Sequence, residues 1–161
     1  MLSALLPGAQ HLQNIHPLIV HFPIALLYGA ALVYVLAWLT RKRESLAWTG
    51  LWMLGLGTIG AAAAVASGLY ASEGVMIAPS VRQHLLLNHE HIMIGVLVLS
   101  IILFIWAWFS RPLPVRGGLI FLLLLAVLLA ALTAGADFGG RMVYDYNAGG
   151  NACSQPIDFT Q

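Results

Sequence analysis

Long apolar blocks alternate with short polar segments along this chain. Four apolar runs cover approximately residues 17–39, 46–71, 85–109 and 117–136. Each is close to the roughly 20 residues that a helix needs to cross about 30 Å of hydrocarbon. The pattern predicts an all-α, integral membrane four-helix bundle within residues 1–136, followed by a polar tail over residues 137–161.

The charges of the short loops orient this bundle. The segments 41–44 and 111–116 hold five of the seven Lys and Arg residues. An even number of spans places both loops on the same side, and cationic loops mark the cytoplasmic side. Both termini are then expected on the outer side, which is the periplasm in a Gram-negative host. The expected location is the bacterial inner (plasma) membrane, crossed several times.

Composition narrows the class of protein further. The chain is 60% hydrophobic and 8% charged, whereas a soluble domain is about a quarter charged. The lipid bilayer is therefore the first partner, and the polar residues are too few for a soluble catalytic domain of ordinary size. With a net charge of +1 and dispersed cations, no nucleic-acid partner is expected. The one cysteine, Cys153, belongs to no C-x-x-C-H run, which excludes covalent haem c.

Six histidines fall on the expected outer side, one group around the start of the first span and another around the start of the third. They are His11, His16, His21, His84, His89 and His91. An imidazole at a lipid boundary costs free energy unless it has a partner. Their gathering at one face therefore indicates a shared ligand, with a metal ion or haem as the first hypothesis.

Helical periodicity limits which histidines can act together. Pro17 suits the first turn of a helix, which places His16 at the cap and His21 just over one turn inside. His84 and His91 are seven residues apart and share a face, while His89 points roughly away from His91. One ion cannot bind all of them. The zinc-protease motif H-E-x-x-H is excluded, because Met93 stands where its second histidine would be.

Two chemistries fit these histidines. Haem b needs two imidazoles facing each other, usually from different helices; His21 with His91 fits best, and His16, His89 and His84 are further candidates. A Zn, Cu or Fe ion needs three or four converging ligands. The candidate metal ligands are His16, His21, His89, His91 and Glu90. The residues expected to fix the imidazole tautomers are Glu73, Glu90, Asp137 and Asn88.

Small residues recur at a spacing of four in two spans. They are Gly60, Ala64 and Gly68 in the second span and Ala126, Ala130 and Ala134 in the fourth. Such stripes allow close helix approach in a membrane. Both are interpreted as packing seams.

The residues IHPLIVHFPIAL at 15–26 resemble the opening motif of a bacterial family of four-helix membrane domains of unknown function. The likeness continues through SGLYASEG at 67–74, the H-x-x-x-G of His91 to Gly95, and GGRMVYDY at 139–146. Members of that family are found alone or fused to cytochrome c-like or Rieske-type modules, which implies a redox setting. The resemblance points to His16, His21 and His91 as site residues. This chain departs from the family after GG-x-x-V-Y at 139–144, where the family often has a histidine and glycine-valine pairs and this chain has DYNAGG at 145–150.

Three functions follow as hypotheses. The first is a haem b-binding electron-transfer subunit of a larger respiratory or redox complex, exchanging electrons at the outer face with quinol and a partner such as a c-type cytochrome. The second is an outer-face protein that binds or transports a transition metal. The third is a structural anchor without a cofactor. No nucleophile and base pair is visible, which favours an electron-transfer subunit over a stand-alone enzyme.

Overall fold

The computed structural model describes residues 15–40, 43–110 and 118–148. Within these ranges the chain is entirely helical apart from short connections. The helices are α2 (His16–Leu39), α3 (Arg43–Gly74), α4 (Pro79–Val81), a π-helical turn (Arg82–Leu86), α5 (Leu87–Ser110) and α6 (Gly118–Tyr144). No strand occurs in the described ranges. The expectation of an all-α membrane bundle is confirmed.

Four helical segments are long and apolar enough to cross a membrane. Two of them are α2 and α6, a third is α3, and the fourth runs without a break from Pro79 to Ser110 through the π-helical turn. Two helices extend beyond the apolar runs of the sequence. Helix α3 covers residues 43–74 rather than 46–71, and α6 continues to Tyr144 rather than ending at residue 136. The first part of the polar tail is therefore helical.

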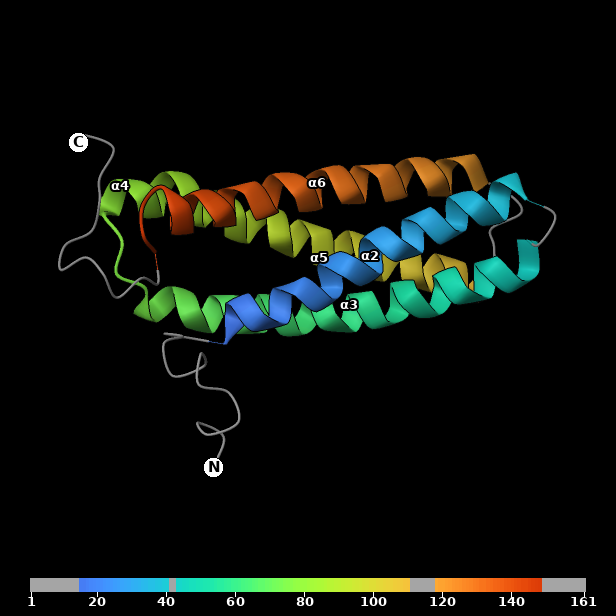
Figure 1. Ribbon diagram of the computed structural model, residues 1–161, viewed down its shortest axis with the longest axis horizontal. Helices are drawn as coiled ribbons and strands as arrows, with labels where there is room; N and C mark the ends of the chain where they lie inside the picture. The colour runs from blue at the N-terminus through green and yellow to red at the C-terminus, as the bar shows by residue number, and fades with distance from the viewer. Residues whose placement is uncertain (1–14, 41–42, 111–117, 149–161) are drawn as a thin grey trace, which may run out of the picture.

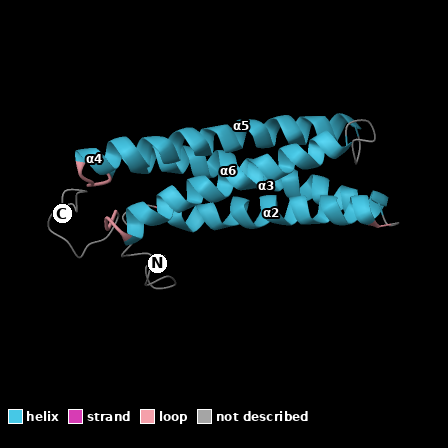
Figure 2. Ribbon diagram, turned by 90° about the horizontal axis from the view of Figure 1, so that it is seen from above, coloured by secondary structure: helices cyan, strands magenta, loops and turns pink. Residues whose placement is uncertain are grey.

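The bundle consists of two helical hairpins, α2 with α3 and α5 with α6 (Figures 1 and 2). Helices α3 and α5 join the hairpins, and α2 contacts α6 less extensively. We call the end that holds the starts of α2 and α5 and the ends of α3 and α6 the histidine end. The opposite end, which holds Trp38, Trp48 and Trp106, is the tryptophan end.

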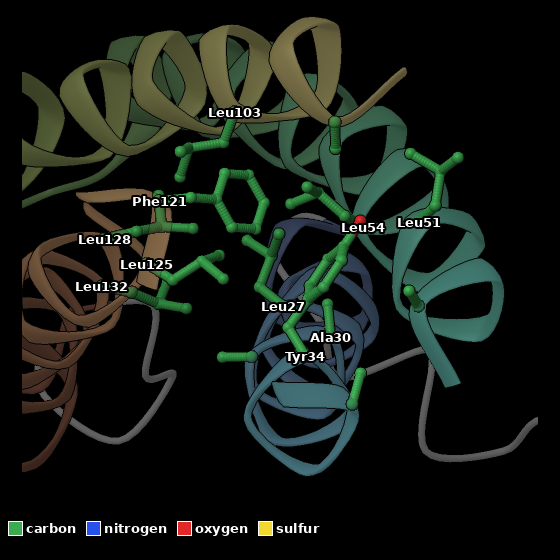
Figure 3. Close-up of a cluster of buried hydrophobic side chains, with 14 of the residues drawn as sticks. Leu27, Ala30, Tyr34, Leu51, Leu54, Leu103, Phe121, Leu125, Leu128 and Leu132 are labelled. Carbon is green, nitrogen blue, oxygen red and sulfur yellow. The ribbon is translucent and has the colours of Figure 1, made fainter. Parts of the chain in front are cut away.

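The main hydrophobic core lies between the hairpins (Figure 3). Its largest member is Tyr34, whose ring meets Phe121 edge-on at 5.0 Å between ring centres. Phe121 meets Trp106 in the same way at 5.7 Å. Aromatic rings prefer this edge-to-face arrangement, so three aromatic side chains from three helices join the two hairpins.

One of the two predicted packing seams is present. An added Cβ at Gly60 would lie 2.9 Å from the Phe22 ring, and one at Gly68 would lie 2.9 Å from the His16 ring, both on α2. The seam predicted on α6 is wrong within this chain, because Ala126, Ala130 and Ala134 are all exposed. The buried face of α6 carries the larger side chains Phe121, Leu125, Leu128 and Leu132 instead.

Candidate two-histidine site

The structure separates the histidines by burial. His16 and His89 are half-buried, whereas His21, His84 and His91 are exposed. His11 lies outside the described residues. The two half-buried rings therefore form the candidate site.

His16 and His89 face each other across the two hairpins at the histidine end. His16 begins α2, and His89 lies in the first turn of α5. Their ring centres are 6.4 Å apart and their planes are nearly perpendicular, at 85°. The pair brings together residues 73 positions apart, so it depends on the packing of the hairpins rather than on local sequence.

A backbone carbonyl fixes the proton of His89. Its Nδ1 lies 2.7 Å from the carbonyl oxygen of Gly135 on α6. A carbonyl oxygen only accepts hydrogen bonds, so Nδ1 donates and carries the proton in the neutral ring. The lone pair of His89 is then on Nε2. A histidine that binds a metal through Nε2 has this same tautomer.

A serine fixes His16 in the same tautomer. Its Nδ1 lies 3.1 Å from Oγ of Ser67 on α3. The Ser67 hydroxyl donates its own hydrogen to the carbonyl of Ala64, at 3.0 Å. The oxygen therefore accepts from Nδ1 of His16, which leaves the lone pair of His16 on Nε2. Each ring is oriented by the other helix of its own hairpin.

Two glycines make room for these rings. An added Cβ at Gly68 would lie 2.9 Å from Cε1 of His16, and one at Gly139 would lie 3.1 Å from Cε1 of His89. Each ring thus lies against the backbone of the neighbouring helix. A side chain at position 68 would force the His16 ring to shift, and one at position 139 would push the His89 ring by a few tenths of an ångström.

The π-helical turn before α5 sets the direction of His89. A π turn accommodates one residue more than an α turn, and one residue corresponds to a rotation of about 100° on a helix. The turn buries Leu85 and Leu86, while His84 within it stays exposed. Arg82 anchors its start by donating to the carbonyls of Ser72 and Val75, both at 3.2 Å.

His21 and His91, the facing pair that the sequence favours, are both exposed, and no hydrogen bond or ring contact joins them within the described ranges. His21 donates from Nδ1 to the carbonyl of Pro17 on its own helix, at 2.7 Å. His91 follows His89 by two residues, so the helical period turns it away when His89 faces inward. Sequence reasoning missed Ser67 and Gly135, although Ser67 opens the SGLYASEG motif.

The acidic and amide residues expected to orient the imidazoles take other positions. Asn88 donates to the carbonyl of His84 at 2.7 Å. Glu73 and Asp137 are exposed, and Glu90 is half-buried. Within the described ranges, no three His, Cys, Asp or Glu side chains come together as a metal site. Serine and backbone oxygens orient the rings instead.

The distance between the two ring centres suits one metal ion that binds both imidazoles. Two imidazoles that bind one metal through a ring nitrogen, at about 2.0–2.1 Å each, have ring centres roughly 6 Å apart. The observed separation of 6.4 Å is close to this value. Haem iron uses two such axial ligands, one on each side of the porphyrin. The donor set of His16 and His89 therefore fits a haem iron.

The chain belongs to a family described as a predicted membrane protein family, DUF2231, whose model matches residues 12–152. The matched range contains five of the six histidines, and His11 lies just before it. Neither the comparison with curated proteins nor that with solved structures finds a match.

Proposed function

We propose that this chain is a haem b-binding electron-transfer subunit of the bacterial plasma membrane, with His16 and His89 as the axial ligands. The observation that carries the proposal is the pairing of these rings at 6.4 Å, each oriented through Nδ1. A bound haem supplies a one-electron iron couple. The protein residues supply two Nε2 lone pairs, hold both rings in one tautomer and tie the two hairpins together.

The number of ligands favours haem over a bare metal ion. A Zn, Cu or Fe ion bound by protein alone takes three or four ligands. The described residues gather two imidazoles and no third His, Cys, Asp or Glu beside them. A haem completes the iron coordination with its own four nitrogens, so two imidazoles suffice.

The loop charges support an outer-face position for this site. The cationic loops at 41–44 and 111–116 belong to the tryptophan end, and cationic loops lie on the cytoplasmic side. The histidine end then faces the periplasm in a Gram-negative host. Electron partners that suit this side are a quinol in the bilayer and a periplasmic c-type cytochrome or Rieske-type protein, in accord with the redox modules that the resemblance implies.

The test is a visible absorption spectrum of the detergent-purified, haem-supplemented protein before and after dithionite, with a pyridine haemochrome assay. We expect b-type α and Soret bands, lost in His16→Ala and in His89→Ala. His84→Ala and His91→Ala are matched controls, because both remove an exposed imidazole from the same end. They should keep the bands.

Three results would overturn the proposal. One is a colourless wild-type protein. Another is a coloured protein whose bands survive both His16→Ala and His89→Ala. The third is stoichiometric metal without porphyrin by elemental analysis, which would favour the metal-binding function.

A further inference from the structure

Helices α2 and α6 carry exposed polar side chains on the sides that face each other. The hydroxyls of Tyr28 on α2 and Thr133 on α6 are hydrogen-bonded to each other across the two helices. This contact defines the facing side of each helix. Both residues are nevertheless exposed, so the contact lies at the surface of the bundle.

Two ionisable residues continue these facing sides toward the histidine end. His21 precedes Tyr28 by seven residues, which is two helical turns, and Asp137 follows Thr133 by four residues, about one turn. Both are exposed. Figure 1 shows the two helices lying apart at this end, where α2 begins beside α3. His21 and Asp137 therefore flank a part of the surface that residues 15–40, 43–110 and 118–148 do not cover.

His21 lies within the hydrocarbon layer of the membrane, where exposure of a polar side chain costs free energy. Helix α2 has 24 residues, which is about 36 Å at 1.5 Å per residue. Centred on about 30 Å of hydrocarbon, it places His21 roughly 4 Å inside the apolar layer. Exposed Leu18 and Phe22 surround it on the same helix. Ionisable residues at such a depth usually serve a ligand.

Both ionisable groups accept hydrogen bonds. The Nδ1 of His21 donates to the carbonyl of Pro17, at 2.7 Å, so its lone pair is on Nε2. Asp137 makes no hydrogen bond or ion pair with the described part of the chain. The complementary ligand carries two hydrogen-bond donors, is soluble in the bilayer and bears no negative charge.

We propose that His21 and Asp137 bind the headgroup of a membrane quinol, each accepting one of its two hydroxyl hydrogens. The quinol enters from the lipid between α2 and α6. A phospholipid phosphate is disfavoured, because the Asp137 carboxylate repels it and a phosphate diester lacks a donor. The exposed hydroxyls of Tyr28 and Thr133 close the far end of the surface.

The proposed surface adjoins the two-histidine site. His21 follows His16 by five residues on α2, and Asp137 follows Gly135, the carbonyl partner of His89, by two residues on α6. The idea that the quinol donates electrons to this protein rests on the proposed function. The binding itself needs only residues of this chain, so the two ideas are tested separately.

The experiment is calorimetric titration of the protein in phosphatidylcholine nanodiscs with decylubiquinol, without oxygen. Choline headgroups donate no hydrogen bond from nitrogen, so the lipid does not compete. We expect saturable binding by the wild type and at least about tenfold weaker binding, close to the loss of one good hydrogen bond, for His21→Ala and Asp137→Ala, each of which removes an acceptor. Oxidised decylubiquinone lacks hydroxyl donors and should bind more weakly to the wild type.

Matched controls are His91→Ala and Glu73→Ala, which change exposed residues at the same end on other helices. Both should bind decylubiquinol as the wild type does. The proposal is overturned if His21→Ala and Asp137→Ala also bind like the wild type while keeping the wild-type elution volume. Equal weakening by His91→Ala, or competition by phosphatidylethanolamine at equal concentration, would overturn it as well.

Failure of the haem proposal is recognised independently. Quinol binding by a colourless protein rejects the haem and keeps the quinol surface. A protein that has b-type bands and does not bind decylubiquinol keeps the haem proposal and rejects the quinol surface.

Discussion

The two ends of the bundle join the hairpins in opposite ways. At the histidine end the connection is polar: His16 and His89 face each other, and each Nδ1 has a defined oxygen partner. Toward the tryptophan end the connection is made by the rings of Tyr34, Phe121 and Trp106. The buried Tyr34 hydroxyl has no hydrogen-bond partner in the described structure.

This difference separates stability from chemistry. In a membrane, helix association depends largely on van der Waals packing, which the aromatic contacts supply without any use of the Tyr34 hydroxyl. At the histidine end, a defined oxygen accepts a hydrogen bond from Nδ1 of each ring. Substitutions at the aromatic contacts should therefore change stability, and those at the histidine end should change ligand binding.

The largest expected effect on stability is that of Phe121→Ala. Phe121 is 0% exposed and lies between Tyr34 and Trp106. Loss of a buried phenyl ring leaves a cavity and costs about 3–5 kcal/mol. The measurement is the free energy of unfolding in mixed SDS micelles. Phe109→Ala is the matched control, because Phe109 is 82% exposed; a similar loss in both variants would contradict the central role of the aromatic contacts.

An intermediate effect is expected for Gly68→Ala. Its new Cβ would lie 2.9 Å from Cε1 of His16, so the ring must move away from Ser67. We expect a loss of about 1–3 kcal/mol from overpacking, together with a shift or loss of the proposed haem bands. Gly95→Ala is the control, because nothing lies within 4 Å of its added Cβ. Unchanged bands in Gly68→Ala would show that the close approach does not position His16.

The smallest effect is expected for Tyr34→Phe, and it has the opposite sign. Removal of a buried hydroxyl without a partner should leave stability unchanged or raise it by up to about 1 kcal/mol. Tyr28→Phe removes a hydroxyl that is bonded to Thr133 and should lower stability by about 0.6 kcal/mol, the average for such bonds in membranes. The same unfolding assay compares the two, and a larger loss in Tyr34→Phe would reveal a polar role for its hydroxyl.

The sequence predicts the helices well, because each apolar run is long enough to cross a membrane by itself. It predicts their ends less well. The stretch after residue 136 is polar in part, yet α6 continues to Tyr144, and Met142 packs in a small cluster with Leu85 and Leu86. That contact joins parts of the chain more than 50 residues apart, so local polarity does not reveal it.

The candidate site could be predicted only in part. The expectation that the two histidine groups meet is satisfied by His16 and His89. The placement of His84 and His91 on one face assumed an unbroken α-helical period between them. The π-helical turn breaks that period, and the orienting oxygens of Ser67 and Gly135 come from the other helix of each hairpin. Neither feature is visible in the spacing of the histidines.

The π-helical turn makes the function of this end depend on chain length as well as on residue identity. The turn Arg82–Leu86 absorbs one extra residue, so a relative that has one residue fewer and an α turn there can present the same histidine to His16. One residue more or fewer after Leu87, where the helix is regular, rotates the ring at position 89 by about 100°. Aligned histidines alone therefore do not identify the pair; the type of turn that precedes them must be known too.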